Sequence, residues 1–411
     1  MSPQRRFTPE SHGTTGVLIG LVALGAISTD LYLPSLPAIG RDLGADIART
    51  QLTLGIFLAG FALAQLVLGP LSDRFGRRPV LLAGAAIYLV ASIACALAPS
   101  IEALIAARGV QAIGACAGVV IGRAVVRDIY GRERAARMLA YISSAMALLP
   151  ALGPIAGGMI EVWLGWRWNF VILASFGSIV LIGVAGGLAE TNAWRDPSAL
   201  APRRLVANYA QVLSDRVFIR FALAVAFSYA GLFAFTSGSS FVIIDALGVP
   251  ADRFGYFFAG AVVGYIAGTQ IAGKFTLKLG IERMVVMGAL VGAAGGIAMA
   301  IVAWSGWVGP GIAGAVTLVI PMAVFMIGIG IVMPNANAGA IGPFATMAGT
   351  ASAVVGFLQM SIAAVIGVVF GQLHDGTSRP MASLIAAMSL IVLVCAWGVV
   401  GSRRPAPGGD H

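Results

Sequence analysis

The sequence predicts an all-α membrane protein in which twelve transmembrane helices form two six-helix halves. The composition, the long apolar runs and a partial internal repeat predict this fold. The 411 residues are 59% hydrophobic and only 10% charged, whereas soluble proteins carry about 25% charged residues. Because so apolar a chain cannot cover itself with a polar surface, a lipid bilayer is its expected solvent.

Twelve runs are continuously apolar and close to the length of about 20 residues that a helix needs to cross a bilayer. Strands of a membrane barrel would alternate polar and apolar residues over about ten positions, so the runs favour helices. We expect the helices at 15–38, 50–72, 79–98, 101–126, 137–160, 168–189, 218–245, 253–277, 284–304, 309–334, 348–372 and 380–401.

The longest polar stretch divides these helices six to six. We expect an N-terminal tail (1–14), a first six-helix bundle (15–189), a central loop (190–217), a second bundle (218–401) and a C-terminal tail (402–411). The tails and the central loop are expected to be cytoplasmic.

The two halves share a partial repeat. Residues 69–84 read GPLSDRFGRRPVLLAG and residues 273–288 read GKFTLKLGIERMVVMG. Repeated halves are typical of transporters, which bind their substrate near the midplane between the repeats. Three glycines align without gaps, Gly69 with Gly273, Gly76 with Gly280 and Gly84 with Gly288, whereas Asp73 is replaced by Leu277.

Positive charge predicts the orientation. With both termini in the cytoplasm, twenty of the 26 arginines and lysines fall on the inner side and five on the outer side. This distribution follows the positive-inside rule.

Other function classes lack their usual signals. The arginines lie in short segments without an aromatic stacking platform, which argues against nucleic-acid binding despite a net charge of +9. Cys95, Cys116 and Cys395 fall in three different apolar runs, which argues against a disulfide framework or a metal site. No phosphate-binding G-x-x-x-x-G-K-[ST] loop is present, and we expect no cofactor or metal.

The loop after the second helix, GPLSDRFGRR, resembles the signature loop of the major facilitator superfamily. The matching residues are Gly69, Asp73, Arg74, Gly76, Arg77 and Arg78. The stretches STDLYLPSLPAI (28–39), RGVQAIGACAGVVIGRAVVRDIY (108–130) and LPALGPIAGG (149–158) resemble its twelve-helix, proton-coupled drug-efflux branch. Together with FAFTSGSSFVI (233–243) and GTASAVVGFLQM (349–360), they are most similar to the bicyclomycin and chloramphenicol resistance group.

The signature loop is expected to act as a cytoplasmic gate. Gly76 permits a tight reversal, and Arg127 and Asp128, at the inner end of the fourth helix, bring an acid within reach of the arginines. The resemblance implies that this cluster latches the halves while the outer side is open, with Asp73 facing the N-terminal end of the eleventh helix. In the alternative interpretation, the arginines only fix topology.

Asp30 and Arg108 are the candidate proton-coupling residues. A charge within an apolar helix is costly and functional by default, and burial disfavours the charged carboxylate. We expect Arg108 to respond to the protonation of Asp30, directly or through water and backbone. The alternatives are a helix cap at Asp30, since Pro34 and Pro37 follow it, and a structural arginine bonded to carbonyls of the first helix.

The fifth predicted helix resembles the antiporter motif of the same branch. Its residues are Pro150, Gly153, Pro154, Gly157 and Gly158. Two prolines one turn apart would kink the helix, and the glycines would allow close helix packing. A hinge that controls leak is the functional interpretation, and ordinary packing is the alternative.

Aromatic, methionine and glutamine side chains are the candidate substrate contacts, because they suit adaptable apolar binding. The resemblance implies that their helices line the cavity. The candidates are Tyr32, Phe57, Phe61, Gln111, Tyr141, Met146, Phe233, Phe235 and Gln359.

We therefore expect a proton-coupled exporter of amphipathic drugs such as chloramphenicol- or bicyclomycin-like compounds in a bacterial inner membrane. Its expected partners are a small-molecule substrate, protons and the bilayer, without nucleic acid, and we expect a monomer. A proton-coupled transporter of a metabolite or nutrient is the main alternative. A membrane-embedded enzyme is less favoured because the apolar runs contain no histidine and no nucleophile–base pair.

Overall fold

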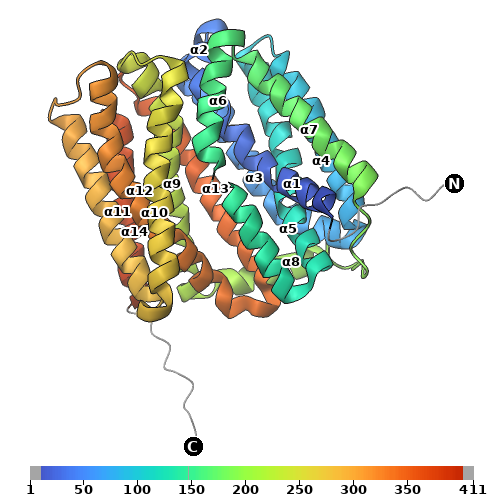
Figure 1. Cartoon of the computed structure of the whole chain (residues 1–411). Helices are drawn as coiled ribbons and strands as arrows, with labels where there is room; N and C mark the ends of the chain where they lie inside the picture. The colour runs from blue at the N-terminus through green and yellow to red at the C-terminus, as the bar shows by residue number, and fades with distance from the viewer. Residues whose placement is uncertain (1–10, 147, 401–411) are drawn as a thin grey trace, which may run out of the picture.

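The computed structural model of the chain describes residues 11–146 and 148–400, and these residues form helices and connecting loops without a strand. Figure 1 shows the helices of the first half, from blue to green, beside those of the second half, from yellow to red. The first half comprises α1 (His12–Asp30), η1 (Leu33–Ser35), α2 (Leu36–Asp42), α3 (Ile47–Phe75), α4 (Arg77–Ala96), α5 (Ile101–Met146), α6 (Leu149–Leu164) and α7 (Arg167–Gly187).

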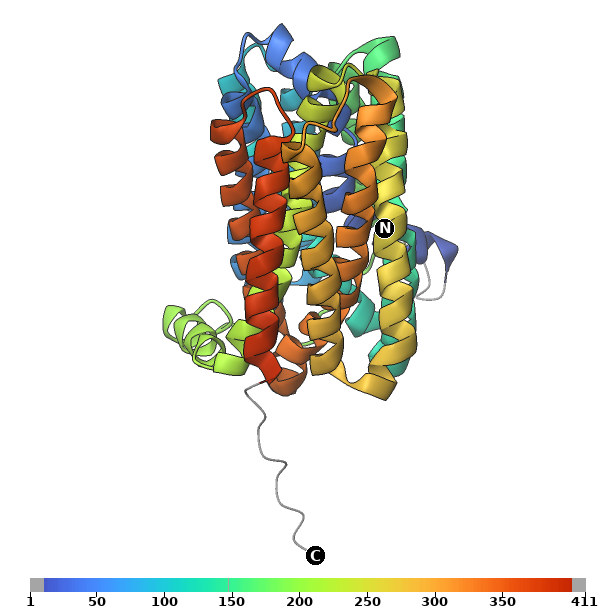
Figure 2. The same cartoon turned by 90° about the vertical axis from the view of Figure 1, so that its left-hand side faces the viewer.

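The second half repeats this arrangement after a polar linker. It comprises α9 (Arg216–Ser240), η2 (Phe241–Ala246), α10 (Ala251–Leu279), α11 (Ile281–Trp304), α12 (Gly311–Ile341), η3 (Gly342–Met347), α13 (Ala348–Leu373) and α14 (Arg379–Val400). The linker contains α8 (Pro202–Leu213), the light-green helix beside the lower end of the bundle in Figure 2. We call this end of the bundle the linker end, and the opposite end the far end.

The bundle has the dimensions and surface of a multi-pass membrane protein. Eleven helices in the described part of the chain are long and apolar enough to cross a bilayer, and α6 is a shorter apolar helix of 16 residues. Leu63, Val90 and Ile182 are 63%, 66% and 70% exposed on the outside of the bundle. Such surfaces are stable in lipid, which confirms the all-α membrane fold.

The predicted boundary between the fourth and fifth helices is wrong. We expected a helix from 137 to 160, but α5 continues to Met146 and α6 begins only at Leu149. The arginine-rich stretch after Arg127 suggested a loop. Arginine and alanine are good helix formers, however, and no proline interrupts the chain before Pro150.

The central segment 190–217 is not a simple loop. It contains α8, which begins with Pro202 in its first turn. Proline favours this position because the first helical N–H groups have no partner within the helix. The hydroxyl of Tyr209 donates to the carbonyl of Leu66 at 2.7 Å, which fixes α8 against α3.

The aligned glycines of the two halves have matching roles. Gly76 joins α3 to α4 at φ +104°, and Gly280 joins α10 to α11 at φ +82°. Both conformations strain any residue with a Cβ atom. Gly84 and Gly288 lie one and a half to two turns into the next helices, and an added Cβ at Gly288 would lie 2.9 Å from the carbonyl oxygen of Gly328.

The α4–α5 contact gives a direct test of this packing. An added Cβ at Gly114 would lie 2.5 Å from the carbonyl oxygen of Gly84 and 2.6 Å from the amide nitrogen of Tyr88. We expect Gly114→Ala to destabilise the bundle by about 1–3 kcal/mol because backbone must move to accept the methyl group. The measurement is the apparent Tm of the purified protein in detergent.

The matched control is Gly109→Ala in the same helix, where the nearest atom is the Ile56 side chain at 3.4 Å. We expect this variant to keep the wild-type Tm or raise it slightly. Equal Tm values for the two variants would contradict the close α4–α5 approach.

Candidate functional site

A cavity of about 1000 Å³ lies between the two halves. Its walls come from α1, α3 and α5 on one side and from α9, α12 and α13 on the other, with α8 at the linker end. Residues toward the middle of the bundle include Thr29, Phe57, Phe61, Gln65, Tyr229 and Gln359, and residues toward the linker end include Asp73, Arg77, Arg123, Arg127, Asp196 and Arg204.

The cavity contains four of the nine predicted substrate contacts. Phe57, Phe61, Met146 and Gln359 line it. Tyr141 lies outside the lining and is 60% exposed. The remaining four are buried in helix contacts instead, and they are Tyr32, Gln111, Phe233 and Phe235.

Sequence reasoning missed several polar lining residues. Gln65, Arg123 and Tyr229 all face the cavity. Gln65 and Arg123 each lie within an apolar helix, and the cost of a polar group in such a helix is the signal that points to them. The helical face that each side chain occupies is a property of the packed bundle.

Arg108 is fully buried among aromatic rings. Its guanidinium carbon lies 4.4 Å from the ring centre of Tyr32 and 4.3 Å from that of Phe57. It donates to the side-chain oxygen of Gln111 at 2.5 Å and to the carbonyl of Thr53 at 3.4 Å. Cation–π contacts and these acceptors stabilise a cation that forms no ion pair with any acid among the residues that the structure describes.

Asp30 is the last residue of α1 and is only 8% exposed. It accepts a hydrogen bond from the hydroxyl of Thr29 at 3.2 Å. Within the described residues, no arginine, lysine or histidine forms an ion pair with it. The C-terminal end of a helix is electrostatically unfavourable for an anion, so little in the surroundings stabilises a charged carboxylate.

The predicted pair of Asp30 and Arg108 is therefore not in direct contact in this conformation. The carbonyl that accepts a hydrogen bond from Arg108 is that of Thr53 in α3, and not one of the first helix. The two residues are connected through neighbouring groups, because Tyr32 follows Asp30 closely in the chain and its ring packs on Arg108.

Helix α6 packs against this region through backbone. An added Cβ at Gly153 would lie 2.8 Å from the Asp30 Cβ, and at Gly157 it would overlap the carbonyl of Leu31. At Gly158 it would overlap the carbonyl of Ala251, at the start of α10. These glycines therefore join the end of α1 to the second half of the molecule.

The prediction that two prolines kink this helix is wrong for one of them. Pro150 lies in the first turn of α6, where the helix needs no N–H donor from it. Pro154 lies inside the helix.

The two halves meet at the far end. Arg41 of α2 forms an ion pair with Asp245 of η2, with 2.8 Å between Nη1 and Oδ1. The side-chain nitrogen of Gln51 donates to the carbonyl of Ser237 at 2.5 Å. The cavity therefore lies on the linker side of these far-end contacts and extends from the middle of the bundle toward the linker end.

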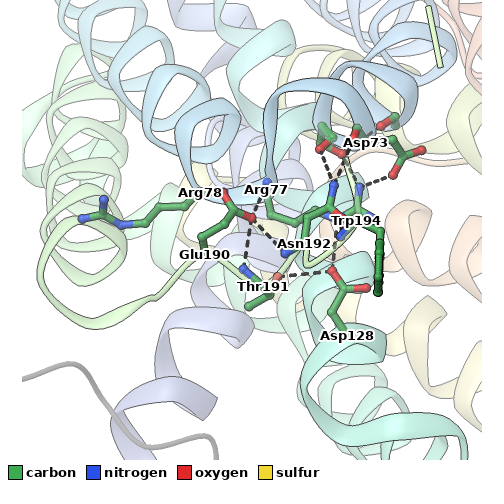
Figure 3. A network of polar contacts seen from close by, with 10 residues as sticks. Asp73, Arg77, Arg78, Asp128, Glu190, Thr191, Asn192 and Trp194 are labelled. Atoms are coloured by element: carbon green, nitrogen blue, oxygen red, sulfur yellow. Dashed lines mark hydrogen bonds and ion pairs between the residues drawn. The ribbon is translucent and has the colours of Figure 1, made fainter. Parts of the chain in front are cut away.

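At the linker end, Arg77 lies at the centre of the predicted charge cluster. Its guanidinium donates from Nη1 to Asp73 at 2.5 Å and from Nε to Asp128 at 3.1 Å (Figure 3). Gly76 makes the reversal before it. Arg74 instead lies 5.3 Å from the Phe75 ring, and Arg78 donates to the carbonyl of Ala185.

Glu190, which the sequence analysis did not single out, binds this loop to the linker. Its carboxylate accepts from the backbone N–H groups of Arg77, at 2.9 Å, and Arg78, at 3.2 Å, at the start of α4. It also accepts from the N–H groups of Thr191 and Asn192 (Figure 3). A carboxylate at a helix N-terminus satisfies unpaired donors and the helix dipole together.

Two further contacts extend this clamp. The side chain of Asn192 donates to the carbonyl of Asp73 at 3.0 Å, and the N–H of Asp196 donates to the same carbonyl at 3.1 Å. The hydroxyl of Thr191 donates to Asp128 at 3.2 Å. These hydrogen bonds therefore hold the first residues of the linker against the signature loop and α5.

Comparison with known families agrees with this architecture. The model of the Major Facilitator Superfamily matches residues 18–368. The chain belongs to the major facilitator superfamily. This confirms the resemblance seen in the GPLSDRFGRR loop and makes the chain a multi-pass membrane transporter.

Relatives within the superfamily include resistance proteins from several bacteria. The chain is 32% identical to a chloramphenicol resistance protein of Pseudomonas aeruginosa, covering 94% of this chain and 90% of that one. It is 28% identical to the bicyclomycin resistance protein homolog of Haemophilus influenzae and 28% identical to multidrug resistance protein D of Escherichia coli. Each alignment covers 95% of this chain and 96% of the relative.

A solved structure has the same fold. The crystal structure of a POT family transporter in complex with 5-aminolevulinic acid superposes with a TM-score of 0.75 at 12% identity. The match covers 96% of this chain and 98% of that one. At this identity the likeness concerns the fold of the superfamily alone.

The Glu190 clamp gives a testable expectation. Glu190→Ala removes the acceptor of four backbone N–H groups, and hydrogen bonds to a charged group contribute about 1.5–3 kcal/mol. We expect roughly ten-fold or faster amide hydrogen exchange at residues 77–78 and 190–196, measured by mass spectrometry. Glu282→Ala, in the first turn of α11, is the control and should leave these amides unchanged. Equal exchange in wild type and Glu190→Ala would contradict the clamp.

Proposed function

We propose that this transporter exports amphipathic antibiotics, such as chloramphenicol- or bicyclomycin-like compounds, in exchange for protons by alternating access. The observation that carries the proposal is Asp30, a buried acid without a basic partner at the joint of α1 and α6. The names of the relatives from Pseudomonas aeruginosa and Haemophilus influenzae support the class of substrate.

The position of Asp30 suggests how protonation would be coupled to substrate. Thr29, which donates to Asp30, lines the cavity, whereas Asp30 itself lies behind it against α6. Loss of the proton from Asp30 would place an unpaired negative charge where α1 contacts Gly153. Such a charge costs several kcal/mol unless water or a cation reaches the carboxylate. Water would reach this position when α6 moves away from α1, so charge and conformation would change together.

The orientation follows from positive charge. The linker end carries Arg74, Arg77 and Arg78, and under the positive-inside rule this charge supports a cytoplasmic location of that end. Both termini would then be cytoplasmic. With this orientation the far-end contacts would close the periplasmic side, and a drug would enter the cavity from the cytoplasm or the inner leaflet.

The test of this function is drug accumulation in cells that lack their own pumps. Cells that carry the chain should accumulate less chloramphenicol or bicyclomycin, and collapse of the proton gradient should abolish the difference. Equal accumulation across a broad drug panel would contradict drug export and favour transport of a metabolite.

Asp30→Asn tests the coupling residue. The amide fills the same volume but cannot ionise, so we expect a folded protein that still binds drug and has lost gradient-driven export. Glu102→Gln is the control, because Glu102 is 59% exposed in an ion pair with Arg49, and it should keep export. Full gradient-driven export by Asp30→Asn would remove Asp30 from the mechanism.

Asp73→Leu tests the proposed latch. Leucine occupies the equivalent position 277 of the second half, and it cannot pair with Arg77 or face the α13 N-terminus. We expect a larger population of the conformation closed at the far end, measured as slower labelling of a cysteine introduced at position 51. Unchanged labelling relative to the same cysteine in an otherwise wild-type chain would count against the latch.

A further inference from the structure

The linker-end part of the cavity carries more positive than negative charge. Among the side chains that line it, Arg77 is paired with Asp73, and Arg204 is paired with Asp196 at 2.6 Å. Hydrogen bonds from Ser198, followed by those from Arg204, hold the pKa of Asp196 below its usual range. Its carboxylate is therefore charged and already satisfied.

Arg123 and Arg127 line the same cavity without an acidic partner. Within the described part of the chain, neither forms an ion pair or a side-chain hydrogen bond. They lie one turn apart on the same face of α5, close enough for their charges to interact. Like charges at this spacing destabilise a helix, and an anion between them would remove that repulsion.

Membrane topology does not explain their position. The positive-inside rule needs arginines near the cytoplasmic ends of helices but does not require them to line a cavity. Arg137, on the same helix, is exposed outside the cavity lining and would meet that need equally well.

The opposite wall of the cavity also favours an anion. Helix α13 begins at Ala348, and its N-cap residue Met347 provides no side-chain acceptor for the first N–H groups. Met347, Gly349 and Thr350 all line the cavity. The positive end of a 26-residue helix dipole thus lies on the same cavity as the two arginines.

We propose that Arg123 and Arg127 form an anion-binding subsite that holds an acidic group, such as a carboxylate, of the transported molecule. This subsite rests on the proposed function, because that function routes the substrate through the central cavity. Amphipathic acids would bind with the apolar part against Phe57 and Phe61 and the anionic group against the arginines.

The test compares two probes that differ only in one charge. Dansylglycine carries a carboxylate, and dansylglycinamide is its neutral amide. Binding to the full chain in phosphatidylcholine nanodiscs is measured by dansyl fluorescence. We expect wild type to bind the acid roughly ten-fold or more tightly than the amide, the scale of charge-assisted hydrogen bonds.

Matched variants assign the preference to the subsite. Arg123→Gln should lose the preference for the acid while binding the amide as wild type does, and Arg123→Lys should keep part of it. Arg137→Gln removes the same charge from the same helix outside the cavity and should retain the wild-type preference. If Arg123→Gln does not fold, Arg127→Gln provides the same comparison.

Several outcomes would overturn the proposal. They are equal binding of the two probes by wild type, no binding of dansylglycine, and an equal loss of preference in Arg123→Gln and Arg137→Gln. A preference present in phosphatidylcholine but lost in phosphatidylglycerol nanodiscs would assign the site to an anionic lipid headgroup and overturn its assignment to substrate. The assay needs no proton gradient, so its result is separate from the test of proton-driven export.

Discussion

The cost of placing charge within a bilayer governs this structure. Inside the bundle, each ionised side chain needs a partner, an aromatic face or contact with a water-filled space. Arg108 has ring faces and the Gln111 oxygen, and Arg77 has two carboxylates. Asp30 accepts from one hydroxyl and forms no ion pair within the described residues, so its charged form has little to stabilise it.

Helix α6 connects this acid to the closure of the far end. Its glycines touch the end of α1 on one face and the start of α10 on the other. Because the contacts at Gly157 and Gly158 are with backbone, a side-chain rotation would not absorb a shift of α1, and such a shift would displace α6 relative to the second half. We therefore propose that the antiporter-like motif acts as a rigid joint between the proposed proton site and the interface of the halves.

The linker end combines a paired and an unpaired set of charges. Arg77 pairs with Asp73 in the signature loop and with Asp128 of α5, and Glu190 binds the loop to the linker. Helix α8 continues from this linker and contributes Arg204 and Tyr209 to the cavity wall. Movement of the signature loop would therefore alter the entrance to the cavity, where Arg123 and Arg127 remain available to a ligand.

The sequence alone determined the membrane fold, the two apolar segments on either side of a polar linker, and the acids Asp73 and Asp128 that pair with Arg77. These features depend on hydropathy, on local spacing and on glycines that a reversal requires, all of which are local properties of the chain. The sequence did not predict that α5 continues through the arginine-rich stretch after Arg127. A cluster of charged residues indicates a loop between apolar helices, even where the same residues have high helix propensity.

Only the tertiary structure decided which side chains share the cavity. Phe57 and Phe233 are equally plausible contacts in the sequence, yet one lines the cavity and the other packs against Gly367. The separation of Asp30 from Arg108, the Glu190 clamp and the unpaired state of Arg123 likewise arise from helix rotation and long-range packing. Apolar helices show little amphipathic pattern, so sequence identifies a polar residue in the membrane, whereas the packed bundle decides what it faces.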